Sequence, residues 1–174
     1  MGQIKYDAIE DKMLSVSKDK VEGNSDTIIR IVNDIIQPYC KDLDKYVQFI
    51  RDCLQDGETP PTNEELDDFC MNLSTLLYFA GSMCEQLGIK DDIAKAIHKE
   101  MYHSARSQIE GGTVADKDSL AELESQEEQL ISVCYSRAYK TMKAKVDNAQ
   151  ELLGSCKKVL SRRMAEIELT RMQK

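Results

Sequence analysis

The feature that most constrains the fold is a series of apolar residues at steps of three and four along the final third of the chain. This spacing predicts one helix from about Leu120 to Ile167. A helix of about 50 residues is roughly 75 Å long, which is too long to hide inside a compact domain of this size. Part of it must therefore pack against residues 26–56, against another chain, or as a coiled coil.

One side of this predicted helix carries the residues that we expect to meet a second subunit. They are Leu130, Cys134, Met142, Val146, Leu152, Cys156, Val159 and Leu160. The rest of the chain also shows helical spacing, no segment alternates as a strand would, and only three prolines and eight glycines interrupt it. We therefore expect an all-α fold of helical hairpins and a long C-terminal helix, assembled into a coiled-coil-like oligomer.

The N-terminal third predicts a helix with a kink. Residues 1–24 are weakly periodic and suggest a short helix or a mobile arm, after which Ser25 or Asp26 offers an N-cap. The next helix keeps its apolar phase across Pro38, so we expect one kinked helix that ends at Asp56-Gly57. A break at residues 58–61 then separates an N-terminal helical appendage, residues 1–60, from a main body, residues 61–174.

Capping residues delimit the helices that follow. Thr62 and Glu65 have the spacing of a capping box, which predicts a helix start. Gly88 is placed as the C-cap of that helix, and Asp91-Asp92 suit the first turn of another. Gly111-Gly112 then closes this second helix. The main body is thus predicted as a helical hairpin followed by the long oligomerisation helix.

The sequence lacks the patterns that catalysis and metal binding require. His98 and His103 lie five residues apart, whereas a metal pair on a helix needs a spacing of four. The six cysteines are 13 or more residues apart, so we expect free thiols buried on apolar helix faces. We expect no catalytic residue, no metal, no cofactor and no enzymatic activity.

The chain also lacks the signals of membrane insertion or export. No apolar run approaches the roughly 18 residues that a transmembrane helix needs. The first seven residues do not show the basic and then apolar order of a signal peptide. We therefore expect a cytoplasmic protein without a membrane partner.

Charge is distributed unevenly along the chain. Residues 135–174 hold ten Lys/Arg against four Asp/Glu, a net charge of +6, while the first 134 residues hold 13 against 27, a net charge of −14. At about 100° per residue, one group of cations falls opposite the apolar side of the long helix. It consists of Lys140, Lys143, Lys157, Lys158 and Arg162. Arg137, Lys145 and Arg163 border the apolar side, where we expect them to pair with acids at a helix–helix contact.

Charge alone leaves two interpretations of the outward cations. They could bind a polyanion such as single-stranded DNA, because each neutralised phosphate adds a salt-sensitive increment to the affinity. Alternatively, the acidic segments could neutralise them across a packed interface, with each exposed pair contributing only about 0–1 kcal/mol.

Three short segments carry a resemblance to a known family. They are residues 103–106 (His-Ser-Ala-Arg), 110–117 (Glu-Gly-Gly-Thr-Val-Ala-Asp-Lys) and 159–164 (Val-Leu-Ser-Arg-Arg-Met). With the helical hairpin and the long C-terminal helix, they make residues 66–172 resemble the small phage recombination mediators of the UvsY type.

The resemblance implies a non-enzymatic accessory protein of the bacterial host cytoplasm. Such proteins form ring-like homo-oligomers through the C-terminal helix, bind single-stranded DNA, and load a RecA-like recombinase onto DNA covered by single-strand-binding protein. Arg106 stands where the family places a cationic DNA contact, while Ser104 stands where it has a lysine. Residues 1–60 have no counterpart in the family, and we expect there a partner-docking hairpin.

A second function class fits the same sequence. The chain could be a phage helical protein that binds other proteins, such as a host- or defence-directed inhibitor or an assembly scaffold, without binding DNA. The low isoelectric point, about 4.9, favours this alternative, because most nucleic-acid-binding proteins are basic.

Overall fold

The computed structural model describes residues 3–55 and 60–172, and the side chains from Glu22 onward except that of Asn24. Within these residues the chain forms four helices and no strand, which confirms the all-α fold class. They are α1 (Gln3–Gln55), α2 (Asn63–Gln108), α3 (Val114–Glu124) and α4 (Gln126–Met172). The coiled-coil oligomer stays a prediction, because a single chain does not test it.

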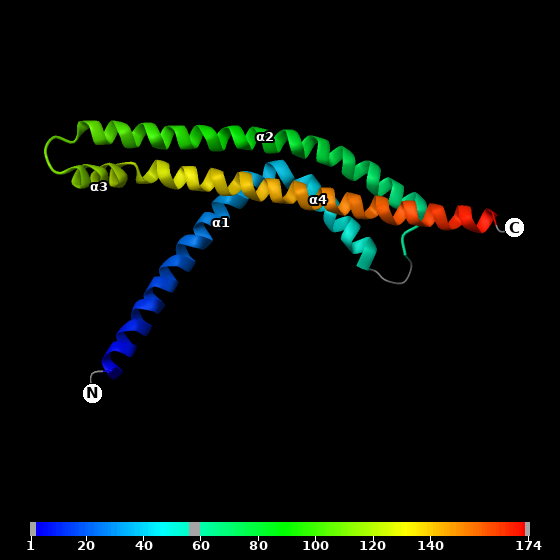
Figure 1. The fold of residues 1–174 in the computed structure, drawn as a ribbon, viewed down its shortest axis with the longest axis horizontal. Coiled ribbons are helices and arrows are strands. Elements are labelled where there is room, and N and C mark those ends of the chain that lie inside the picture. Colours follow the sequence, from blue (N-terminus) through cyan, green and yellow to red (C-terminus); the bar gives the residue numbers. More distant parts are fainter. Residues whose placement is uncertain (1–2, 56–59, 173–174) are drawn as a thin grey trace.

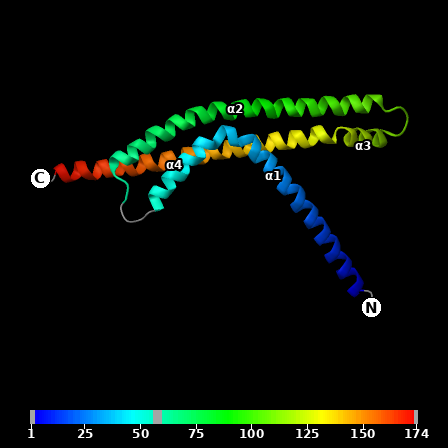
Figure 2. The same cartoon turned by 180° about the vertical axis from the view of Figure 1, so that it is seen from behind.

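Two of the helices form a long antiparallel pair, α2 with α4 (Figure 1). The short helix α3 continues the line of α4 and lies beside the end of α2. Helix α1 crosses the pair near its middle, and its N-terminal half projects away from the other helices in both views (Figure 2).

The first helix is longer than the sequence pattern indicates. It runs without interruption through Pro38, which confirms the prediction of one helix there. The separate segment expected for residues 1–24 and the N-cap at Ser25 or Asp26 are wrong, because α1 is already helical from Gln3. A glycine such as Gly23 costs a helix only about 1 kcal/mol, so it does not have to end one. The predicted end at residues 56–57 and the first half of the break at 58–61 lie outside the described residues.

The start of α2 is the capping box that the sequence predicts. The backbone N–H of Glu65 donates to the Thr62 hydroxyl at 3.2 Å, and the N–H of Thr62 donates to the Glu65 carboxylate at 2.7 Å. The Thr62 hydroxyl also donates to this carboxylate, at 2.9 Å. The bond from the Thr62 N–H, followed by the one from the hydroxyl, stabilises the ionised form and lowers the pKa of Glu65.

The predicted end of this helix at Gly88 is wrong, since α2 continues to Gln108. A Cβ at Gly88 would lie only 3.2 Å from Cε2 of Tyr139 on α4. The glycine therefore allows α2 and α4 to approach closely and does not cap a helix. Asp91, expected in the first turn of a new helix, is instead buried on the inner side of α2.

The chain turns at the two glycines that the sequence predicts, whereas the start of the long helix differs from the prediction in two ways. Gly111 and Gly112 both have φ of +79°, as a chain reversal through glycine allows. Thr113 and Asp116 form a second capping box, which begins α3. The rod predicted from Leu120 to Ile167 is interrupted at Ser125, whose backbone leaves the helical conformation with φ of −97° and ψ of 14°. Its N–H and its hydroxyl both donate to the carbonyl of Ala121, at 3.0 and 2.8 Å.

The apolar core lies where α1 crosses the α2–α4 pair. Its fully buried side chains come from all three helices and include Ile50, Leu66, Leu73, Leu87 and Met142. Val32, Ile36, Cys40 and Leu43 of α1 belong to the same core. The predicted boundary at residue 60 thus separates two segments that share one core.

This packing changes the role expected for the apolar side of α4. Cys134, Met142, Val146 and Cys156 are buried within this single chain. Leu152, Val159 and Leu160 are partly buried against the core, and only Leu130 is exposed to 50 %. The cover that we expected from a second subunit is supplied here by the chain itself, mainly by α1 and α2.

The shared core can be tested with one matched pair of substitutions on α1. Ile50→Ala should lower the free energy of unfolding by about 2–5 kcal/mol, because Ile50 is fully buried and leaves a cavity. Ile29→Ala, at a position 53 % exposed, should change it by about 0.5 kcal/mol or less. Urea titration followed by circular dichroism measures both. Equal effects would show that α1 does not belong to the core.

Candidate nucleic-acid interface

The five outward cations of α4 all remain exposed in the folded chain. Lys140, Lys143, Lys157 and Lys158 form no ion pair with any residue that the structure describes. Arg162 lies 3.6 Å from Glu166 one turn further on, and its side chain is 73 % exposed. We call these five residues the cationic row. The neutralisation that the second interpretation requires is therefore not made within the described chain.

The cations that border the apolar side have other partners. Lys145 donates to both carboxylate oxygens of Asp44 on α1, at 2.7 and 2.8 Å, as the sequence predicts. Arg163 donates to the carbonyl of Pro61, a backbone acceptor instead of the expected acid, and so ties α4 to the start of α2. Arg137 lines a groove between α4 and α1. Lys145 and Arg163 hold the helices together and are not available to a ligand.

Two acids divide the cationic row. Asp147 and Glu151 are exposed and, at about 100° per residue, face the same side of α4 as the row. They leave Lys140 and Lys143 as one group and residues 157–162 as another. The two groups are separated by 14 residues, or about 21 Å along the helix. A polyanion would contact the two groups separately.

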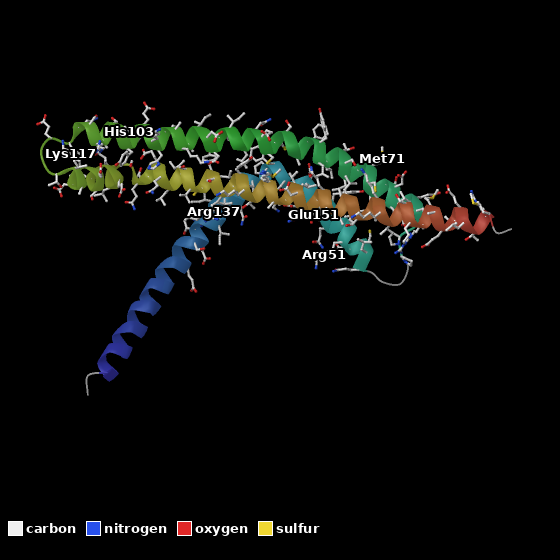
Figure 3. All side chains as sticks on the ribbon, viewed as in Figure 1. Arg51, Met71, His103, Lys117, Arg137 and Glu151 are labelled. Atoms are coloured by element: carbon white, nitrogen blue, oxygen red, sulfur yellow. The ribbon has the colours of Figure 1, made fainter. Side chains whose placement is uncertain are left out.

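Arg106 is engaged within the chain and lies away from the row. Its Nε donates to Oδ1 of Asp118 on α3, and the hydroxyl of Tyr102 donates to the same oxygen at 3.2 Å. The hydrogen bond from Arg106 is the main cause that lowers the pKa of Asp118. Figure 3 places the neighbouring His103 at the turn end of the hairpin, whereas Glu151 lies in the other half. Arg106 therefore joins α2 to α3, and the structure does not bring it together with Lys140–Arg162.

The remaining chemistry-bearing side chains form no cluster. Among the described residues, no group of three or more His, Cys, Asp or Glu side chains is placed to hold a metal ion. All six cysteines are free thiols, as expected, and five are buried while Cys53 is half-buried. Burial, followed by a hydrogen bond to Asp44, raises the pKa of the Cys40 thiol to about 11.

An exposed apolar face on α2 was not predicted. It consists of Met71, Tyr78, Phe79 and Ile89, with exposures of 66, 78, 56 and 60 %. Glu85 is the only charged residue between positions 71 and 89. This lack of charge is visible in the sequence and could have predicted an exposed apolar face, because a solvent-facing helix side normally carries charged residues. We call these four residues the α2 apolar face.

Comparison of the chain with protein-family models, with curated proteins and with solved structures finds no match. Across the described helices, no segment combines the length and the apolarity needed to cross a membrane.

The tie between Arg106 and Asp118 can be tested directly. Because the guanidinium stabilises the ionised carboxylate, Arg106→Gln should raise the pKa of Asp118 toward its ordinary value. Part of the depression should remain, since Tyr102 still donates to the same oxygen. An NMR titration of the side-chain carboxyl carbon measures it, with Lys99→Gln on the same helix as control. An unchanged Asp118 pKa in the Arg106 variant would contradict the assignment.

Proposed function

We propose that this chain is a non-enzymatic recombination mediator that binds single-stranded DNA through the cationic row and assists the loading of a RecA-like recombinase. The observation that carries the proposal is the exposure of Lys140, Lys143, Lys157 and Lys158 without an ion-pair partner in the described chain. In an acidic protein, a long helix that keeps such side chains free presents a local positive surface. The resemblance of residues 66–172 to phage mediators supports the same function.

Local charge supports this binding more than the net charge of −8 opposes it. At physiological salt the Debye length is about 8 Å, so a bound phosphate senses mainly the side chains around it. Bound along α4, a strand would meet two exposed cationic groups, one at Lys140 and Lys143 and one at residues 157–162. The proposal includes three further properties of such mediators. They act in the bacterial host cytoplasm, they form homo-oligomers, and they work on DNA covered by single-strand-binding protein.

The salt dependence of binding to oligo(dT) tests the proposal quantitatively. Each phosphate neutralised on a single strand contributes about −0.7 to the slope of log K against log salt, so five contacts give about −3.5. Lys140→Gln with Lys143→Gln should reduce the slope to about −2.1 by removing two contacts. Fluorescence anisotropy at several salt concentrations measures both values.

A closely matched control is present on α1, where Lys41 and Lys45 are exposed and lie four residues apart, against three residues for Lys140 and Lys143. Lys41→Gln with Lys45→Gln removes the same net charge and should leave the slope near that of the unmodified chain. If both double variants lowered the slope equally, net charge and not the position of the lysines would determine the binding. The absence of binding at low salt would refute the proposal.

The α2 apolar face favours a second candidate function, binding to another protein. Soluble monomers seldom expose a contiguous apolar patch larger than a few hundred Å², and those that do often use it as a contact surface. Tyr78 and Phe79 contact each other edge to face, with ring centroids 5.5 Å apart, and present two aromatic side chains to solvent. Aromatic residues of this kind dominate protein–protein contacts. In this case the chain acts as a phage inhibitor or scaffold without DNA binding.

The second candidate predicts a different pattern of loss. Wild-type protein immobilised on beads should retain a defined host protein, and Met71→Glu with Tyr78→Glu should abolish retention, because the charges desolvate poorly in an apolar contact. Lys140→Gln with Lys143→Gln serves as the control and should retain the protein as the wild type does. Oligo(dT) should stay unbound throughout. Retention of the same protein by the Met71 and Tyr78 variant would exclude this face as the contact.

A further inference from the structure

The half of the hairpin nearest the turn is only two helices thick. There α2 and α4 enclose an apolar groove of about 290 Å³ that no third helix covers. Its lining residues are Lys90, Ile93, Ala94, Ile97, Glu128, Ile131 and Tyr135. We call it the end groove.

In this half of the hairpin the small side chains are buried and the large apolar ones are exposed, which is the reverse of the usual arrangement. The residues buried there are small or polar, such as Ala94, Ala105 and Ser132. The large residues Ile93, Ile97 and Ile131 are instead exposed to 53, 48 and 53 %. Full burial of one isoleucine is worth about 1.5–3 kcal/mol, so the exposed ones leave a substantial stabilisation unused. A further helix in the end groove would recover it.

The end groove lies next to the surface on which α1 packs. At its border, Lys90 of α2 donates to the hydroxyl of Tyr39 on α1 at 2.6 Å and lies 5.2 Å from the centre of that ring. Tyr135, which lines the groove, also packs against the core that α1 helps to form. The end groove therefore fits a helix with one apolar side, like the part of α1 that packs against the core.

The chain's own α1 does not continue into the end groove. Ahead of Tyr39 along the chain, Ile28, Ile29 and Val32 lie beside Val133 and Arg137 of α4. The helix thus crosses α4, and its earlier turns leave the hairpin (Figures 1 and 2). Residues 3–24 form a helical stretch about 33 Å long with no other helix beside it. Most of the stability of a helix in a protein comes from packing against other elements, and within the described chain this stretch has no helix to pack against.

We propose that two copies of this chain pair about a two-fold axis, each placing the N-terminal half of α1 in the end groove of the other. Each copy has a helix that lacks a groove and a groove that lacks a helix, and an isologous dimer satisfies both at once. At about 100° per residue, Ile9, Met13 and Val16 of the N-terminal half fall on one side of the helix in its sequence. A standard stable interface buries about 1,600 Å² in total, so each of the two equivalent helix-in-groove contacts has to bury about 800 Å².

This pairing is independent of the DNA-binding proposal. It uses α1 and the end groove, whereas the cationic row lies on the outward side of α4 at residues 140–162. It also differs from assembly through the C-terminal helix, because the apolar side of α4 is largely covered by its own chain.

Light scattering tests the pairing with full-length chains. The wild type should have twice the 19.8 kDa mass of one chain. Ile97→Glu with Ile131→Glu, in the groove, and Met13→Glu with Val16→Glu, in the helix, should each give monomers. Met71→Glu with Tyr78→Glu adds the same charge at exposed apolar positions elsewhere on α2 and should leave the dimer intact. A monomeric wild type, or a groove variant that keeps the wild-type mass, would overturn the proposal.

Chemical cross-linking identifies which segments meet. The groove contains Lys90, and the N-terminal half of α1 contains Lys5, Lys12, Lys18 and Lys20. In a mixture of isotope-labelled and unlabelled chains, an amine-reactive reagent should join Lys90 of one chain to one of these lysines of the other. Links confined to single chains would show that α1 folds back on its own hairpin. Links between chains that omit Lys90 would place the contact elsewhere. Either result would overturn the proposal.

Discussion

Contact between large apolar side chains of three helices occurs in one stretch of this molecule, and the remaining structure depends on it. Ile50 from α1, Leu73 and Leu87 from α2, and Met142 from α4 are fully buried there. Each such side chain is worth about 1.5–3 kcal/mol of burial, which is enough to hold two very long helices side by side. Because α1 covers only this stretch, both ends of the α2–α4 pair are thinner.

Several local elements follow from the sequence because their causes are local. The capping box of Thr62 and Glu65 depends on four consecutive residues, and the continuous helix across Pro38 on an unbroken apolar phase. The long helices themselves follow from the three-and-four spacing. What the spacing cannot reveal is which surface covers an apolar side. Met142 could have met a second subunit equally well, and the paths of α1 and α2 together decide that it does not.

The candidate site shows the same division between local and distant causes. The outward position of Lys140 and Lys143 follows from helical geometry, and the structure leaves both exposed. The engagement of Arg106 by Asp118 depends on a turn of two glycines that brings α3 back beside α2. Residues 12 apart in sequence thus pair through a chain reversal whose shape the sequence pattern does not specify. The function proposed for the row and the pairing proposed for α1 accordingly use different parts of the molecule.

The contact of Gly88 with Tyr139 has a mechanical consequence. It lies where the three-helix part of the pair gives way to the two-helix part, and there the Tyr139 ring of α4 packs closely against the backbone of α2. A methyl group at Gly88 would require the Tyr139 ring to shift by a few tenths of an ångström. Beyond this contact α2 continues toward the turn for another 20 residues, or about 30 Å, and α4 for 13 residues, or about 20 Å. If the two helices moved apart by a few tenths of an ångström at Gly88, the change in the angle between them would give a larger displacement toward Gly111. The residue at position 88 is thus connected, through one ring contact, to the spacing of the two helices near the turn.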